Sequence, residues 1–296
     1  MSTTDRSAPP VLREALNEHA GHYLSAGRLI EAGETPFQSY EVWDTPQFGR
    51  LFRLDGYFMT SEGDEFFYHE NLIHVPCIAQ HAPQTALIIG GGDGGSADEL
   101  LKHPSMARVT LVELDEKVIE IARRHLPAVH NGALDDPRLD LHVADGLHYV
   151  RDTAPAAGAR FDLIVLDLTD PVGPAEALYT EAFFADCKRL LSDQGALSLH
   201  LGAPIFQPTR VADLMARLRA VFSTVRPHFH YIPLYGSLCG MACASDRIDP
   251  QALCAEEVDR RIGDRHLRRL QYYNGETHCA AFAQPNYLRQ LLAAHP

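Results

Sequence analysis

The sequence predicts an α/β fold, in which a doubly wound, mostly parallel sheet follows a small N-terminal antiparallel β domain. Beyond residue 80, continuous apolar runs of strand length alternate with stretches of helical pattern, which is typical of parallel strands buried on both faces. A glycine-rich segment follows the first of these runs directly. Before residue 80 the pattern differs, because residues 36–60 alternate and are rich in Tyr, Phe, Val and Leu.

The N-terminal part of the chain is predicted to form the β domain and a linking helix. Residues 36–60 are interrupted by Thr-Pro and Asp-Gly, which are turn signals. Residues 64–81 then place apolar side chains at helical spacing. We therefore place a domain boundary near residue 80, with the β domain and its helix in 1–80 and the sheet domain in 81–296.

Six strands are predicted in the second domain, because each run is short, apolar and bounded by polar or glycine-containing stretches. They lie at residues 85–90, 108–114, 139–145, 161–167, 195–201 and 236–245. In such a sheet the ligand lies beyond the carboxyl ends of the strands, where the strand order reverses. The residues that end each strand are therefore the first candidates for a site.

Composition excludes several classes of function. The net charge of −13 disfavours a nucleic-acid partner and suits a cationic ligand. The sequence shows neither a long apolar run, as membrane insertion would need, nor an apolar region near residue 1, as export would need. A cytoplasmic protein is therefore expected. The six cysteines form no Cys-x-x-Cys pair, and His69 and His74 lack metal-pair spacing. We expect reduced thiols and no metal site.

The first predicted strand ends in Gly90-Gly91-Gly92-Asp93-Gly94-Gly95, which fits a nucleotide-binding glycine loop before a helix, as in Rossmann-like sheets. The second strand ends at Glu113, an acid placed to accept hydrogen bonds from ribose hydroxyls. Asp115 is expected to cap the following helix. Asp145, before Gly146 at the end of the third strand, has two readings, an adenine contact or a helix cap.

The fourth strand ends at Asp167, and Asp170 follows three residues later. Together with Asp93 these carboxylates are expected to converge at one mouth. Like charges at short range raise one another's pKa and cost stability, so the cluster predicts a cationic ligand. Asp93 would repel the carboxylate of S-adenosylmethionine but attract the aminopropyl cation of its decarboxylated form. Asp167 would then take the proton from an attacking amine, and Asp170 would hold the diamine.

These residues carry a family resemblance. The sequence is similar to spermidine synthases, the polyamine aminopropyltransferases, over roughly residues 36–292. The matching segments, in the family's order, are YHENLIHVP, LIIGGGDGG, VELDEKVI, DLTDPVGPAEALY, YIPLYGS and YYNGETHCAAFAQPNYL. The resemblance implies a Rossmann-like domain of the S-adenosylmethionine-binding type, a homodimer or homotetramer, and no cofactor, since decarboxylated S-adenosylmethionine is a co-substrate.

The resemblance also implies roles for individual residues. Asp167 matches the proton acceptor. The donor side is matched by Gln38, Asp93, Glu113, Asp145, Gly146 and Pro174, and the acceptor side by His69, Tyr68, Asp170 and Tyr235. Taken without the resemblance, His69, Tyr68 and Tyr235 would be read as structural residues.

Four positions depart from the family pattern and leave the acceptor open. They are Met59 in place of a glutamine, Gly63 in place of an arginine, Leu168 in place of a small residue and Leu234 in place of a threonine. The expected acceptor is putrescine, with cadaverine or agmatine as alternatives. The competing functions are an S-adenosylmethionine-dependent methyltransferase, a nicotinamide-dependent oxidoreductase and a non-catalytic polyamine-binding protein.

Overall fold

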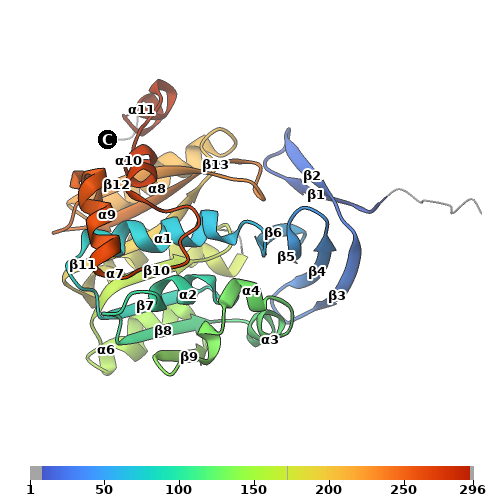
Figure 1. The fold of residues 1–296 in the computed structure, drawn as a ribbon, viewed down its shortest axis with the longest axis horizontal. Coiled ribbons are helices and arrows are strands. Elements are labelled where there is room, and N and C mark those ends of the chain that lie inside the picture. Colours follow the sequence, from blue (N-terminus) through green and yellow to red (C-terminus); the bar gives the residue numbers. More distant parts are fainter. Residues whose placement is uncertain (1–8, 172, 294–296) are drawn as a thin grey trace, which may run out of the picture.

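The computed structural model describes residues 9–171 and 173–293. A seven-stranded sheet with helices on both faces forms the larger body, and a smaller antiparallel sheet lies at one side of it (Figure 1). The strand order of the large sheet is β12-β13-β11-β10-β7-β8-β9. Its strands are β7 (Thr85–Gly90), β8 (Arg108–Glu113), β9 (Leu139–Val143), β10 (Phe161–Asp167), β11 (Leu191–Gly202), β12 (Thr224–Ile232) and β13 (Ser237–Ser245).

The predicted fold class is confirmed. Strands β11, β10, β7, β8 and β9 pair in parallel, and β13 and β12 add an antiparallel edge. All six predicted strands are present. Strand β12 was not predicted, because its run begins Thr-Val-Arg-Pro-His and mixes polar with apolar residues. Since β7 has β8 on one side and β10 on the other, the strand order reverses between β7 and β10.

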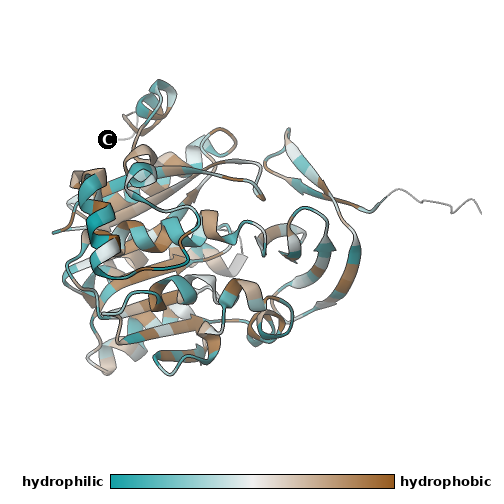
Figure 2. Cartoon of the chain, viewed as in Figure 1, coloured by the Kyte–Doolittle hydropathy of each residue, from teal (hydrophilic) through white to brown (hydrophobic). Residues whose placement is uncertain are grey.

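Alternate side chains of the parallel strands enter two cores, one on each face of the sheet. From β7, Ala86 and Ile88 pack with helices α1 (Glu65–Ala79) and α2 (Gly95–Leu101). Leu87 and Ile89 pack on the other face with α7 (Glu181–Leu190) and α8 (Pro208–Val221). The strands of the large sheet are mostly brown in Figure 2, and the helices around them carry both teal and brown segments. Burial on both faces explains the uninterrupted apolar runs of the sequence.

The smaller sheet has the order β3-β4-β5-β6, all antiparallel. Its strands are β3 (Arg28–Glu34), β4 (Ser39–Thr45), β5 (Gly49–Leu54) and β6 (Tyr57–Ser61). The antiparallel domain predicted over residues 36–60 is thus present. A hairpin of β1 (Val11–Ala15) and β2 (Gly21–Ser25) precedes it and was not predicted. Val42 and Phe52 of this sheet pack against α3 (Glu116–His125), which joins the two bodies.

Helix α1 follows β6 and lies on the large sheet. Its Leu72, Ile73 and Cys77 share one core with β7, β8 and β10. The remaining helices are α4 (Pro127–His130), α5 (Gly146–His148), α6 (Ala154–Ala156), α9 (Ala255–Asp264), α10 (Gly275–Ala281) and α11 (Asn286–Ala293). The domain boundary near residue 80 stays a prediction.

Two further properties bear on the expectations from composition. Within residues 9–171 and 173–293, no helix has the length and apolar character needed to cross a bilayer. All six cysteines are free thiols, and four of them are buried.

Candidate active site

The glycine loop lies where the strand order reverses, against the end of β10. Gly90 of β7 pairs in register with Asp167, and the Gly91 amide donates to the Asp167 carbonyl oxygen at 2.9 Å. Gly90 adopts φ +81°, and a Cβ atom there would lie 2.2 Å from that carbonyl oxygen. Only glycine permits both the left-handed backbone and the close approach. The loop thus holds Asp93 and Asp167 at one edge of the sheet.

His69 joins the two carboxylates. Its Nε2 lies 3.7 Å from Asp93 Oδ2, and its Nδ1 lies 2.8 Å from Glu65 Oε2. One ring nitrogen of His69 and one carboxylate oxygen each of Asp93 and Asp167 lie within 4.8 Å of one another. Gly95 permits this packing, because a Cβ atom at position 95 would lie 2.2 Å from His69 Cε1. The Gly95 amide also donates to Asp93 Oδ1 at 2.9 Å, which fixes that carboxylate at the start of α2.

The electrostatics of this cluster keep His69 charged. Burial alone would lower the pKa of His69, but Asp93, Glu65 and Asp167 outweigh it and raise that pKa to about 10. An imidazolium donates from both nitrogens and has no lone pair for a metal ion. At neutral pH the cluster is therefore suited to hydrogen bonding and to an organic ligand.

Asp167 is placed to act as a base. Burial raises the pKa of its carboxyl group, the nearby His69 imidazolium opposes that rise, and Asp93 adds to it. The Ser96 hydroxyl donates to Asp167 Oδ2 at 2.7 Å, and Tyr68 lies close enough to lower the same pKa. The net shift is upward, so this carboxylate holds a proton more readily than an exposed aspartate does.

Glu113 ends β8 beside the glycine loop. It accepts from the amides of Gly92 at 3.1 Å and Asp115 at 2.9 Å. Its side chain is buried, and burial outweighs these hydrogen bonds to raise the pKa to about 7. Asp115 caps α3 as predicted, by accepting from the Lys117 amide. Asp115 also accepts from Gln38 Nε2 at 3.0 Å, which brings Gln38 of the small sheet to the same edge.

Of the two roles predicted for Asp145, the structure shows the helix cap. Its Oδ1 accepts from the amides of Leu147 at 2.7 Å and His148 at 3.3 Å, so the residue caps α5. Gly146 is buried, and a Cβ atom there would lie 2.5 Å from Ile89 Cγ2. A contact of either residue with adenine stays a prediction. The Pro174 side chain lies outside the described residues.

Asp170 departs from the expected cluster of three free carboxylates. Its Oδ2 lies 2.6 Å from Arg210 Nη1 and accepts from Gln207 Nε2 at 3.1 Å. The Arg210 cation lowers the pKa of Asp170, although burial opposes that shift. The chain itself therefore supplies two cations, His69 and Arg210, that offset the repulsion among the carboxylates. The sequence had predicted that a cationic ligand alone would do so.

Tyr68 and Tyr235 lie together next to this cluster. Their ring centroids are 6.1 Å apart, and Tyr68 meets His69 edge-on at 5.3 Å. The Tyr235 hydroxyl donates to the Met59 carbonyl at 2.7 Å. This bond does not depend on the Met59 side chain, which is one of the four departures from the family pattern. Leu234, another of them, is buried in a core with Phe48 and Phe58.

Comparison with known proteins shows the family of this chain. A family model described as "Spermine/spermidine synthase domain" matches residues 65–250. A polyamine aminopropyltransferase of Nitrosomonas europaea is 47% identical over 99% of this chain and 91% of its own. One of Klebsiella pneumoniae is 37% identical over 96% of this chain and 98% of its own.

Solved structures give the same result. A spermidine synthase in complex with the transition-state analogue AdoDATO is 34% identical, with a TM-score of 0.88 over 98% of this chain and 99% of its own. That of Thermotoga maritima is 33% identical, with a TM-score of 0.87 over 98% of each chain. The chain belongs to the spermine/spermidine synthase family. It is a transferase, a polyamine aminopropyltransferase.

Four residues of this aminopropyltransferase site were missed in the sequence. Ser96 and Glu65 hydrogen bond to Asp167 and His69. Gln207 and Arg210 contact Asp170 from the start of α8. Ser96 had a detectable signal, because it directly follows the glycine loop, and Glu65 lies one helical turn before His69. No local signal links residues 207 and 210 to Asp170, since the contact depends on tertiary packing.

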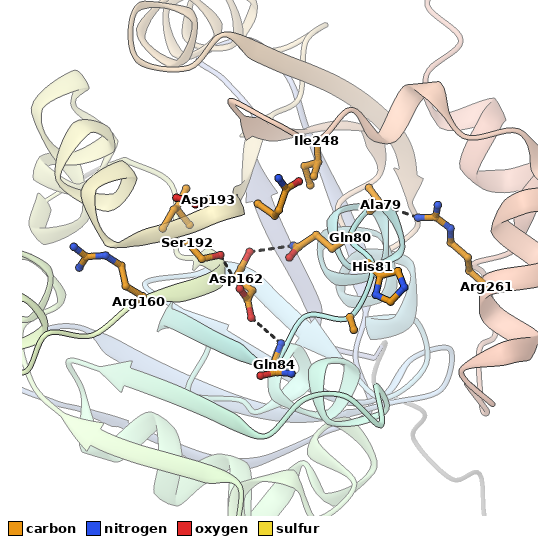
Figure 3. A pocket seen from close by; sticks show the side chains of 13 residues that line it. Ala79, Gln80, His81, Gln84, Arg160, Asp162, Ser192, Asp193, Ile248 and Arg261 are labelled. Carbon is orange, nitrogen blue, oxygen red and sulfur yellow. Dashed lines mark hydrogen bonds between the residues drawn. The ribbon is translucent and has the colours of Figure 1, made fainter.

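A separate cavity lies at the opposite edge of the sheet. Its volume is about 950 Å³, and it is formed where β7, β10 and β11 begin (Figure 3). Asp162 in its wall accepts from the Gln84 and Thr85 amides at 2.8 and 3.1 Å, and Ser192 Oγ donates to it at 2.7 Å. Ligands in doubly wound sheets bind at the carboxyl ends of the strands, so this cavity is not part of the aminopropyltransferase site.

Proposed function

We propose that this enzyme transfers the aminopropyl group of decarboxylated S-adenosylmethionine to putrescine, giving spermidine and methylthioadenosine. The observation that carries the proposal is the position of Asp93 within the glycine loop, 3.7 Å from His69 and beside Asp167. A carboxylate there attracts a donor that ends in a bare ammonium and repels one that ends in an amino acid. The same argument disfavours intact S-adenosylmethionine and hence a methyltransferase.

The donor would lie along the carboxyl ends of β7, β8 and β9. Glu113 would accept hydrogen bonds from the ribose hydroxyls, with Gln38 nearby, and Asp145 and Gly146 would meet the adenine. Asp93 would hold the aminopropyl ammonium. The burial of Glu113 and its position next to Gly92 support this arrangement, because the ribose would pass the glycines at that point.

The reaction is a displacement at the carbon next to the sulfonium. Alkylammonium groups have pKa values near about 10, so the acceptor nitrogen must lose a proton before it attacks. Asp167 would accept that proton, a role that its raised pKa supports. The new N–C bond forms as the C–S bond breaks, and the electron pair of that bond stays on sulfur. Methylthioadenosine leaves as a neutral thioether, so no electrophilic cofactor is needed to assist departure.

The acceptor diamine would lie between the tyrosine pair and Asp170. Tyr68 and Tyr235 would contact its hydrocarbon chain and His69 its reacting end, while Asp170 would face its far ammonium. The ring contacts of Tyr68 with His69 and Tyr235 support this order along the pocket. A homodimer or homotetramer and a cytoplasmic location stay predictions.

Two measurements test the proposed function. The first compares the rise in melting temperature caused by decarboxylated and intact S-adenosylmethionine, and the decarboxylated form should raise it more. The second follows methylthioadenosine release with putrescine, cadaverine and agmatine, and putrescine should give the highest kcat/KM. A larger rise with intact S-adenosylmethionine would overturn the donor assignment, whereas a preference for another amine would overturn only the acceptor.

A further inference from the structure

Arg210 forms an ion pair with Asp170, the carboxylate proposed to face the far ammonium of the acceptor. Its Nη1 lies 2.6 Å from Asp170 Oδ2, and its side chain is 15% exposed, against 45% for Asp170. The Gln207 amide donates to the same carboxylate oxygen at 3.1 Å. A guanidinium pairs strongly with a carboxylate and stays charged at all accessible pH. A diamine that approaches Asp170 therefore meets a cation already in place.

The surroundings of Arg210 are shaped to hold it there. Gly202 has φ +97°, and a Cβ atom at this position would lie 3.3 Å from Arg210 Cζ and 2.5 Å from Gln207 Oε1. The Ala203 amide donates to Gln207 Oε1 at 3.2 Å, which orients that side chain between Arg210 and Asp170. Within the described part of the chain, Nε and Nη2 of Arg210 are buried without a hydrogen-bond partner. Its main interaction is thus the charge pair with Asp170.

A second carboxylate, Glu14 of the hairpin strand β1, faces the same region. Its side chain is partly buried and accepts from the Phe58 amide at 2.6 Å. Burial is the main cause that raises the pKa of Glu14 to about 7, and repulsion from Asp170 adds to it. Burial raises the pKa of the nearby Cys239 thiol to about 12, and Asp170, Arg210 and Glu14 all act on that pKa. The three charged groups therefore share one end of the pocket.

The same end of the pocket is connected to the proposed base. Tyr179 is buried, its hydroxyl donates to the Thr169 carbonyl next to Asp170 at 3.0 Å, and the same hydroxyl lies 2.6 Å from His200 Nε2. Tyr68 lies next to Asp167, and its ring centroid is 6.5 Å from that of His200. Burial lowers the pKa of His200 to about 4; the Arg210 cation lowers it further, and Asp170 opposes this shift. An amine with its reacting nitrogen at Asp167 thus extends toward the Asp170–Arg210 pair.

We propose that Arg210 is a specificity-determining residue that restricts the acceptor to amines with one ammonium beyond the reacting nitrogen. Above pH 7, Glu14 and Asp170 carry two negative charges, and Arg210 cancels one of them. Arg53 also lies near Glu14, but it is paired with Glu41 at 2.6 Å. The remaining charge matches the single far ammonium of a diamine. A triamine such as spermidine brings two further cations, and the second of these is repelled by Arg210. The enzyme would therefore stop at its triamine product. The inference rests on the proposed function.

The test is the variant Arg210→Met, which removes the charge and keeps most of the side-chain volume. Methylthioadenosine release is measured at saturating decarboxylated S-adenosylmethionine with putrescine and with spermidine as acceptors. The ratio of kcat/KM for spermidine to that for putrescine should rise about tenfold, as expected for one charge removed a few ångströms from a ligand cation. A ratio within about twofold of the parent would overturn the inference.

Two further variants separate charge from packing. Asp170→Asn leaves Glu14 and Arg210 with no net charge, so kcat/KM for putrescine should fall about tenfold. The double variant Asp170→Asn with Arg210→Met removes both partners of the ion pair and leaves neither of them unpaired, so it should fold even if a single variant does not. Its net charge equals that of the parent, and its spermidine-to-putrescine ratio should return to the parental value. A double variant that keeps a raised ratio would overturn the inference.

Arg219→Met is the matched control, because Arg219 is an exposed cation on the same helix whose guanidinium donates to the Leu292 carbonyl of α11 at 2.9 Å. It should leave the ratio unchanged, and a change as large as that of Arg210→Met would overturn the inference. Failure of the proposed function is distinguishable in the same assay. If the parent released no methylthioadenosine with any amine, the function itself would be wrong. If it released methylthioadenosine but the Arg210→Met ratio stayed parental, only the role of Arg210 would be wrong.

Discussion

Asp162 and Asp167 lie near opposite ends of β10 and have opposite surroundings. Asp162 accepts from the Gln84 and Thr85 amides, and the Ser192 hydroxyl donates to its other oxygen. Asp167 accepts from side-chain hydroxyls instead, from Ser96 at 2.7 Å and from Tyr68. One carboxylate is satisfied by the backbone of its own sheet. The other faces a buried imidazolium and a second acid.

This difference separates a structural carboxylate from the proposed base on the same strand. Backbone amides are fixed donors, so Asp162 joins the starts of β7 and β11 and has little capacity left for a ligand. Asp167 is buried beside Asp93, and burial raises its pKa. A buried carboxylate with a raised pKa that lies beside a second acid at the edge of a sheet is a candidate functional group.

The largest expected effect comes from Asp167→Asn. The amide cannot accept the amine proton, so kcat should fall by about 10²–10⁴-fold, the range for loss of a general base. Binding of the donor should change little, because the base acts in the transition state. Methylthioadenosine release measures the first effect, and calorimetric titration with decarboxylated S-adenosylmethionine measures the second. Turnover near that of the parent would remove Asp167 from the mechanism.

Asp162→Asn on the same strand is the control. The free energy of unfolding in urea should fall by about 1–3 kcal/mol, since one oxygen that accepts from backbone amides or from Ser192 becomes a donor. The kcat of the folded variant should stay within about twofold of the parent. If Asp162→Asn reduced kcat as strongly as Asp167→Asn, the contrast between the two ends of β10 would be lost.

The positions of the residues at the proposed reactive edge of the sheet were largely predictable from the sequence, because these residues end apolar runs. Gly90, Glu113 and Asp167 directly terminate strands, and parallel strands bring their carboxyl ends to one edge. The residue types at those ends then carried the chemistry. The same reasoning identified Asp115 as a helix cap, since the signal for a cap is local.

The counter-charges were not predictable in this way. Arg210 lies 40 residues beyond Asp170 in the sequence, and only the packing of α8 against β11 brings them together. The hairpin that carries Glu14 was also missed, because its two strands have five residues each and show no alternation of apolar and polar residues. Sequence patterns report what one element buries. They do not report which charge from another element will face it.

Glu113 sharpens the contrast between Asp162 and Asp167. It lies buried at the carboxyl ends of the strands, as Asp167 does, but accepts hydrogen bonds from backbone amides, as Asp162 does. Its pKa of about 7 lies above the ordinary glutamate value, so it is protonated below pH 7 and ionised above it. Ribose hydroxyls donate more strongly to the ionised form. The affinity for methylthioadenosine should therefore be about tenfold weaker at pH 6 than at pH 8. Calorimetric titration at the two pH values measures this difference.

Glu113→Gln supplies the control for that pH dependence. The neutral amide cannot titrate, so its affinity for methylthioadenosine should vary little between pH 6 and pH 8 and should resemble that of the parent at the lower pH. A parent enzyme with the same affinity at both values would show that Glu113 does not hold the ribose. Equal pH dependence in the parent and the variant would place the titrating group elsewhere.

Asp145 gives the smallest expected effect. It tests the contrast between Asp162 and Asp167 most directly, because it is exposed and accepts from two amides of α5, yet it is predicted to bind the donor. Asp145→Ser separates the two roles. Serine is also a good helix cap, so the free energy of unfolding should change by less than about 0.5 kcal/mol. Its shorter side chain cannot accept from an adenine amino group at the same position, and the affinity for methylthioadenosine should fall by about fivefold, near the net value of one hydrogen bond. An unchanged affinity would make Asp145 a cap alone, and the rule drawn from Asp162 would then extend to the reactive edge: a carboxylate satisfied by backbone amides has no ligand to hold.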